Sequence, residues 1–187
     1  MTLGGWIFLA VVVAVIAFAV TTYNRLVGLR QRSNAAWSDI DVQLKRRTDL
    51  VPNLVETVKG YAAHERTTLD QVIRARGAAV AAATPETRVQ AENQLTGALR
   101  QLFALAEAYP QLKANTNFQA LQHSLNGIEE AVQDSRRYYN AVVRDLNTAI
   151  ASFPSNLIAS FFRFLPRNYF ELDRPEDRQV PRVSFGS

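Results

Sequence analysis

Residues 6–20 have the sequence WIFLAVVVAVIAFAV, an unbroken run of apolar side chains. Extending the run to Leu3 and Thr22 gives 20 residues, or about 30 Å of helix, which matches the hydrocarbon core of a bilayer. Residues 1–24 contain no charged side chain, so all 21 basic and 17 acidic residues follow them. The stretch predicts a transmembrane anchor over residues 1–24.

The side chains that flank the run predict its orientation. Trp6 and Tyr23 lie near its two ends, where amphipathic rings favour the membrane interface. Arg25, Arg30 and Arg32 follow the run, whereas only the amino terminus supplies a positive charge before it. Basic residues favour the cytoplasmic side, so we expect an N-terminus outside the inner membrane and a cytoplasmic remainder.

A cleaved signal peptide is the alternative interpretation of the same stretch. Ala17, Phe18 and Ala19 have the small-x-small pattern of a cleavage site. A signal peptide also needs a basic region before its apolar run, and residues 1–5 contain none. The sequence therefore favours a retained anchor.

The remainder up to residue 153 has the apolar spacing of helices. Residues 117–153 alternate apolar steps of three and four over about five heptads, as in a coiled coil. Thr84 is expected to cap a helix that starts at Pro85. No stretch shows sustained period-two alternation, so we predict an all-α chain. The predicted helices cover residues 25–50, 52–82, 86–109 and 117–153.

Pro52 is the ambiguous break in this pattern. The apolar spacing passes through it nearly in register, which permits one kinked helix over residues 25–82. Four helices of comparable length pack together better than one very long helix among short ones. We therefore predict an N-terminal transmembrane helix followed by an antiparallel four-helix bundle of long helices over residues 25–153.

Residues 154–170 have the sequence PSNLIASFFRFLPRNYF, with arginines as the only charged side chains. A short, aromatic and basic stretch is typical of an interfacial helix, and the bundle topology returns this stretch to the bilayer. The alternative is that these aromatic side chains cap the open end of the bundle. The predicted membrane-interface residues are Trp6, Tyr23, Arg25, Arg30, Arg32, Phe161, Phe162, Arg163, Phe164 and Arg167.

Several longer motifs resemble the LemA family of bacterial membrane proteins. They include DVQLKRR at 41–47, DLVPNLV at 49–55, VKGY at 58–61, His64-Glu65, LKAN at 112–115, Tyr139-Asn140 and PRVSF at 181–185. The resemblance covers nearly the whole chain. It implies a single N-terminal span, an outside N-terminus and a cytoplasmic helical bundle, and it implies no established catalytic activity.

The composition argues against catalytic and metal sites. The chain has no Cys, only His64 and His123, and none of the glycine-rich phosphate loops. His64-Glu65 begins like a zinc-protease motif, but Thr68 stands where the second histidine is needed. We therefore predict no catalytic residue, no metal ligand, no cofactor and no enzymatic activity.

Two polar groups are candidates for other roles. Glu65 lies at a bundle-facing step, so we predict a buried ion pair with Lys59, Arg76 or Lys113. If the first turn falls near Pro52, an exposed tip carries the candidate partner-binding residues Lys45, Arg46, Arg47 and Asn53. The nearby acidic residues and the absence of a recognition motif argue against a nucleic-acid partner.

Residues 171–187 are rich in charged side chains and proline, so we expect an extended or disordered tail. Together these features predict a membrane-anchored helical scaffold or adaptor that self-associates and presents its bundle to an unknown cytoplasmic protein partner. The single span and the heptad seam both offer surfaces for a homo-oligomer. The alternative is an enzyme, or its regulatory subunit, that uses the carboxylates of Glu65 and Glu92 in the bundle core.

Overall fold

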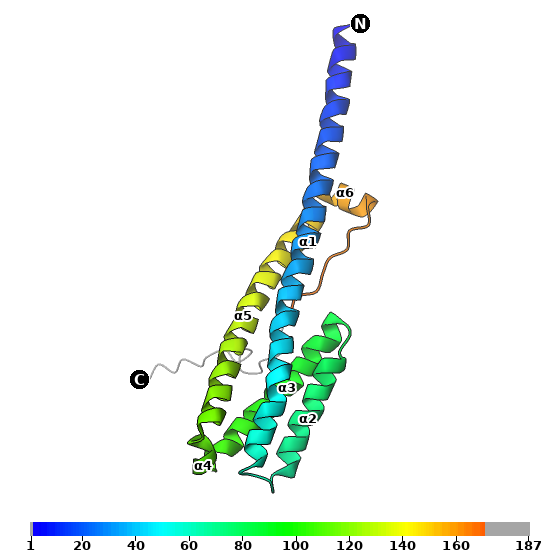
Figure 1. The fold of residues 1–187 in the computed structure, drawn as a ribbon. Coiled ribbons are helices and arrows are strands. Elements are labelled where there is room, and N and C mark those ends of the chain that lie inside the picture. Colours follow the sequence, from blue (N-terminus) through cyan, green and yellow to red (C-terminus); the bar gives the residue numbers. More distant parts are fainter. Residues whose placement is uncertain (1, 171–187) are drawn as a thin grey trace, which may run out of the picture. The chain divides into compact units, whose positions relative to one another are not determined.

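The structure is a computed structural model that describes residues 2–170. All regular secondary structure in this range is helical, so the predicted all-α class is confirmed (Figure 1). The expected tail at 171–187 lies outside the described residues. The helices are α1 (Leu3–Lys59), α2 (Arg66–Ala81), α3 (Pro85–Glu107), α4 (Pro110–Lys113), α5 (Thr116–Ala151) and α6 (Ser155–Phe161).

The described residues form two compact units. The first unit contains residues 2–43 and Glu129–Phe170, and the second contains Leu44–Ile128. The predicted divisions at residues 24 and 153 fall within the first unit and stay predictions, as does the antiparallel four-helix bundle. Thr84 caps α3 and Pro85 is its first residue, as predicted, with a reciprocal hydrogen-bonded capping box between Thr84 and Thr87.

Helix α1 passes through Pro52, so the predicted break there is wrong. Proline has no N–H to donate to the carbonyl four residues before it. The structure replaces that bond with a side chain, because Arg76 Nε of α2 donates to the Thr48 carbonyl oxygen at 2.9 Å. The chain reverses instead at the turn after Lys59, before α2 begins at Arg66.

The second unit is closed by the α2–α3 hairpin around a largely apolar core. Leu54, Val58, Val72, Leu95 and Leu102 are each fully buried in it. Burying one such side chain contributes about 1.5–3 kcal/mol relative to leaving it in water. The helical pattern therefore forms a packed core on this hairpin even though α1 and α2 divide at a different place from the predicted one.

One charged cluster lies inside this core. It contains Arg47 of α1 and Arg88, Glu92 and Thr96 of α3, and is called the Glu92 cluster below. Glu92 is completely buried, and its Oε2 lies 3.4 Å from Nη1 of Arg47 while its Oε1 lies 3.7 Å from Nε of Arg88. Arg47 Nη2 also donates to Thr96 Oγ1 at 2.9 Å. These contacts join α1 to α3 within the second unit.

The prediction that Glu65 forms a buried ion pair is wrong. Glu65 is half-buried and accepts a hydrogen bond from the Tyr109 hydroxyl at 3.2 Å. Partial burial, and next the hydrogen bond and charge of Glu65, raise the pKa of Tyr109 above its ordinary value of 10.0. The three expected partners bond elsewhere: Lys59 to Glu56, Arg76 to the Thr48 carbonyl and Lys113 to Glu107.

Removing the charge of Glu92 should destabilise the second unit strongly. In Glu92→Gln the buried guanidinium of Arg47 loses its counter-charge, which is expected to lower the free energy of unfolding by about 3–5 kcal/mol. Denaturant unfolding of the full chain in detergent, followed by helical circular dichroism, measures the change. Glu107→Gln is the matched control, because its pair with Lys113 is exposed and should cost less than about 1 kcal/mol.

The contact of Arg76 with Thr48 should depend on Pro52. Arg76→Leu leaves the buried Thr48 carbonyl without its hydrogen bond, an expected loss of about 1–3 kcal/mol. In a Pro52→Ala background the N–H of residue 52 can bond that carbonyl, so the same substitution should cost at least about 1 kcal/mol less. A double-mutant cycle of unfolding free energies measures the coupling, and additivity within about 0.5 kcal/mol would contradict it.

Candidate membrane-interface site

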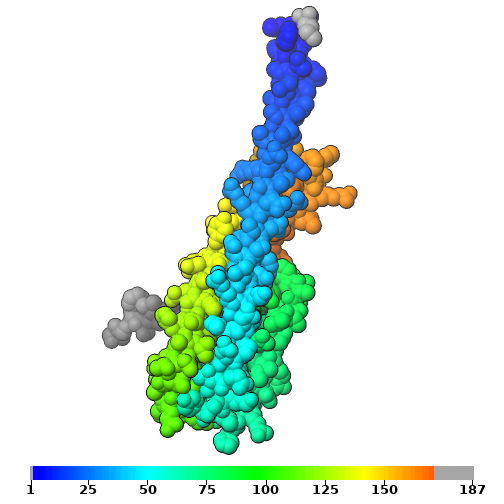
Figure 2. Space-filling view, viewed as in Figure 1, coloured from blue at the N-terminus to red at the C-terminus, as the bar shows by residue number. Residues whose placement is uncertain are grey.

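The amino-terminal third of α1 is apolar and uncovered. Trp6, Phe8 and Val15 expose 58%, 71% and 61% of their surface, and Figure 2 shows this dark blue stretch standing clear of other atoms. Within residues 2–170, α1 is the one helix long and apolar enough to cross a membrane. Thr21 near its end donates to the Ala17 carbonyl at 2.9 Å, which satisfies its hydroxyl inside the helix.

Aromatic side chains from the carboxyl-terminal segment gather where this apolar stretch ends. The ring of Tyr23 lies 4.6 Å from that of Phe162 and 5.8 Å from that of Phe164. The guanidinium carbon of Arg30 lies 5.2 Å from the centre of the Phe164 ring, a cation–π contact. Four predicted interface residues are thus brought together in the first unit, with α6 beside α1 (Figure 1).

The inner side of this segment packs and its outer side does not. Ala159 and Phe164 are buried in a cluster with Leu26 of α1 and Leu146 of α5. Four large side chains point outward instead, and we call them the outer apolar face: Phe153 (80% exposed), Leu157 (61%), Phe161 (80%) and Leu165 (78%). The segment therefore packs on the first unit through part of its side chains, and its docking on lipid stays a prediction.

The turn after α6 directs the chain back along α5. Arg163 has φ 56°, the left-handed conformation that glycine normally adopts at this position. The amide of Phe164 donates to the Ala159 carbonyl at 2.8 Å and that of Arg163 to the Ser160 carbonyl at 3.1 Å, which completes a Schellman motif. The side chain of Arg163 remains exposed.

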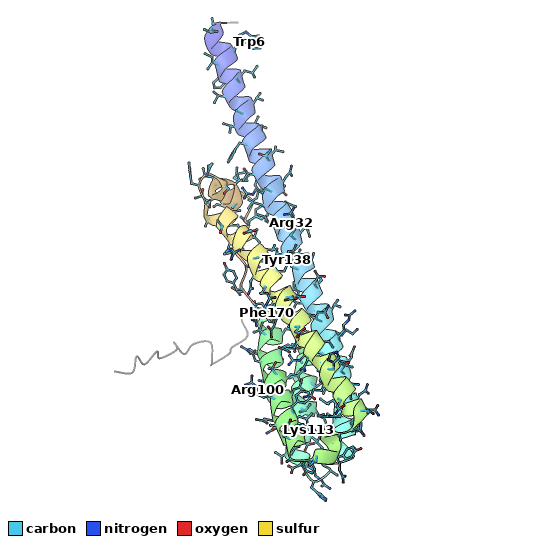
Figure 3. The ribbon with its side chains drawn as sticks, turned by 90° about the vertical axis from the view of Figure 1, so that its left-hand side faces the viewer. Trp6, Arg32, Arg100, Lys113, Tyr138 and Phe170 are labelled. Carbon is cyan, nitrogen blue, oxygen red and sulfur yellow. The ribbon has the colours of Figure 1, made fainter. Side chains whose placement is uncertain are left out.

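Two asparagines of α5 then hold the backbone of the returning segment. Asn147 forms a pair of hydrogen bonds, both 2.9 Å, with the amide and carbonyl of Arg167. Asn140 forms the same pair with Phe170, at 2.8 and 3.0 Å. Phe170, labelled in Figure 3, also packs on Trp37 of α1, 5.7 Å between ring centres. This role of the asparagines was not predicted, and its signals in the sequence are their seven-residue spacing and the Tyr139-Asn140 motif.

The remaining predicted interface residues have different surroundings. Arg167 donates to Asn34 Oδ1 of α1 at 2.6 Å, so it ties the returning segment to the span helix. Arg25 and Arg32 are exposed on α1, immediately after the apolar stretch (Figure 3 labels Arg32 and Trp6). Trp6 lies near the other end of that stretch, as its position in the sequence requires.

The prediction that Lys45 and its neighbours lie at an exposed turn between two helices is wrong. Because α1 continues to Lys59, this basic cluster lies within a helix, and Arg47 is buried in the Glu92 cluster. Lys45, Arg46 and Asn53 are exposed and stay candidate partner-binding residues.

The two carboxylates considered for catalysis have different surroundings. Glu92 is 0% exposed and ion-paired, and Glu65 bonds to Tyr109. Over residues 2–170, His, Asp and Glu side chains form no group of three that is able to hold a metal ion. The described residues instead gather aromatic side chains and an arginine at the end of the apolar stretch of α1.

Comparison with known proteins places these features in a family. The family model described as LemA family matches residues 36–185, which confirms the resemblance found in the sequence. Magnetosome proteins MamQ 1 and MamQ 2 of Paramagnetospirillum magneticum are each 26% identical over 186 residues, covering 86% of this chain and 68% of theirs. Magnetosome protein MamQ of Magnetospirillum gryphiswaldense is 24% identical over 188 residues, covering 85% and 69%.

The exposed side chains of the outer apolar face should contact lipid, although the ring of Phe161 also lies 5.0 Å from that of Phe162. We expect Phe161→Ser plus Leu165→Ser to reduce lipid contact of the 153–165 peptide at least fivefold, because each apolar ring or branch favours the interface. Photoreactive lipids in vesicles that contain the full chain, read out by peptide mass spectrometry, measure this contact. Ile73→Ser plus Val80→Ser on α2 is the matched control, since both are exposed and distant in sequence from the span. Unchanged labelling of 153–165 in the first variant would contradict lipid docking.

Proposed function

Because this chain belongs to the LemA family, we propose that it is a membrane-anchored helical scaffold with no catalytic activity, which presents its helical units to cytoplasmic protein partners. The observation that carries the proposal is the continuity of α1. One helix of 57 residues contains the exposed apolar stretch and contributes to both compact units. Anything that binds these units is thereby attached to the anchor without an intervening loop.

The charges beside the span support an inner-membrane location with the N-terminus outside. Arg25, Arg30 and Arg32 follow the apolar stretch, and the outer apolar face lies beside the same end of it. Cations and aromatic side chains together favour an anionic cytoplasmic surface, at about 1 kcal/mol for each cation.

The scaffold role is supported by what the described residues lack as well as by what they expose. The names of the relatives mention no chemical reaction. Within residues 2–170, the buried carboxylate is that of Glu92, and it is ion-paired with Arg47. Lys45, Arg46 and Asn53 of α1 remain exposed on the second unit, where a protein partner can reach them. The uncovered apolar stretch of α1 offers a helix surface for a homo-oligomer, whereas the apolar seam of α5 is buried within the chain.

The chain has no Cys, so one introduced thiol reports the location of its own residue. In intact cells, a membrane-impermeant maleimide should label Thr2→Cys, and it should label Arg46→Cys only after the cells are opened. A crosslinker attached to Arg46→Cys in intact cells should capture a second copy of the chain or a cytoplasmic protein, identified by mass spectrometry.

Labelling of Arg46→Cys from outside would contradict the orientation. Correct labelling without any crosslinked product would leave an anchored protein that is not a scaffold. Asp70→Cys on α2 provides the control for nonspecific crosslinking, because this position is exposed and lies in the same unit.

A further inference from the structure

A pocket of about 560 Å³ lies between α1 and α5 in the first unit. The first residue of α1 that lines it is Asn24, which follows directly after the apolar stretch and Tyr23. Arg25, Gly28 and Arg32 line it from α1, and Arg144, Asp145 and Thr148 line it from α5. Its volume falls within the range of small-molecule sites in proteins. None of the residues that line the pocket takes part in the aromatic contacts of α6.

The side chains that line this pocket carry a net positive charge. It contains three guanidinium groups and one carboxylate. Within residues 2–170, Arg25, Arg32 and Arg144 enter neither an ion pair nor a side-chain hydrogen bond, unlike Arg47 and Arg167. Arg25 and Arg32 are seven residues apart on the same face of α1, or about 10.5 Å along the helix. Their planar groups are therefore available for an anion that enters between the helices.

The neighbouring hydroxyls narrow the chemistry further. Ser152 Oγ donates to the Thr148 carbonyl at 2.8 Å and Ser155 Oγ donates to the Ala149 carbonyl at 2.6 Å, so their protons are already used. The direct donors left for a ligand are the arginines, with Thr148 and Asn24 beside them. Arginine forks match the paired oxygens of phosphate, which favours a phosphate group as the anion.

We propose that this pocket binds the phosphate of an anionic phospholipid headgroup. This inference rests on the proposed membrane anchor, because the anchor fixes the depth of the pocket. Arg25 lies three residues after Thr22, about 4.5 Å along the helix, and the polar layer of a bilayer is about 5–8 Å thick on each side. The end of the pocket at Arg25 is therefore at the depth of lipid phosphates, and Arg32 lies about 10.5 Å further along α1. A headgroup phosphate at this depth would contact Arg25, and the positive charges of Arg32 and Arg144 would attract it from further along the pocket.

Gly28 allows a test that leaves the fold intact. A Cβ atom added at Gly28 meets no atom within 4 Å, so a side chain there extends into open space. Gly28→Glu places a carboxylate among the three arginines, and Gly28→Ala adds only a methyl group. Gln31→Glu is a matched control for net charge, because Gln31 is exposed on α1 one turn further on and does not line the pocket.

Native mass spectrometry of the full chain, released from nanodiscs of phosphatidylcholine with one-tenth phosphatidylglycerol, measures the lipid that stays bound. We expect the wild type, Gly28→Ala and Gln31→Glu to retain phosphatidylglycerol selectively. Gly28→Glu and Arg144→Gln should lower that retention at least tenfold. Equal retention of both lipids by the wild type, or full retention by Gly28→Glu, would overturn the proposal.

A soluble-phosphate arm separates the two sources of the anion. Glycerol phosphate, added in excess, should not displace the lipid, and displacement would assign the pocket to a soluble phosphate compound instead. Extraction of the membranes with alkaline carbonate shows separately whether each variant is embedded. A wild type that is not embedded refutes the anchor, whereas an embedded wild type without lipid selectivity refutes only the pocket.

Discussion

The transfer of residues 3–22 from water to lipid is the constraint on which the rest of this molecule depends. An uncharged helical stretch with uncovered side chains is unfavourable in water, and the helix satisfies its own backbone, so lipid is a suitable solvent for it. In the proposed anchor, the end of the stretch near Tyr23 then sets the level at which other groups would meet the bilayer. Three features lie near that end: the aromatic contacts of α6, the outer apolar face, and the pocket lined by Arg25, Arg32 and Arg144. Their aromatic, apolar and cationic groups suit different layers of a membrane interface.

A second requirement, that buried polar groups find partners, explains how one helix reaches from the span into the second unit. Pro52 leaves the Thr48 carbonyl without its usual donor, and Arg76 supplies one from α2. Glu92 brings a charge into the core, and Arg47 approaches it from α1. Both long-range contacts connect α1 to the α2–α3 hairpin. Polar contacts in this unit thus specify which helix faces meet, while the surrounding apolar side chains supply most of the stabilisation.

Local signals in the sequence were sufficient where a local interaction decides the structure. The all-α class, the apolar helix and the start of α3 at Thr84 and Pro85 follow from periodicity, hydropathy and capping within a few residues. Local signals did not predict that the helix continues through Pro52. The donor that replaces the missing N–H of Pro52 belongs to Arg76, which is 28 residues away from Thr48. The buried ion pair was predicted at Glu65, whereas the structure forms it at Glu92. Both occur at helical core-facing steps, and only the packing of α1 against α3 shows which one is enclosed.

The sequence by itself therefore determined that this chain is helical, that it carries an apolar stretch long enough to span a membrane, that arginines follow this stretch, and that it resembles the LemA family. These properties depend on side-chain type and spacing along one helix. Only the tertiary structure decided that Arg47 is buried rather than exposed, that Asn140 and Asn147 hold the returning segment, and that Arg144 joins Arg25 and Arg32 around one pocket. Each of these contacts joins residues at least 20 positions apart, so it exists only after the chain packs, and no local pattern encodes it.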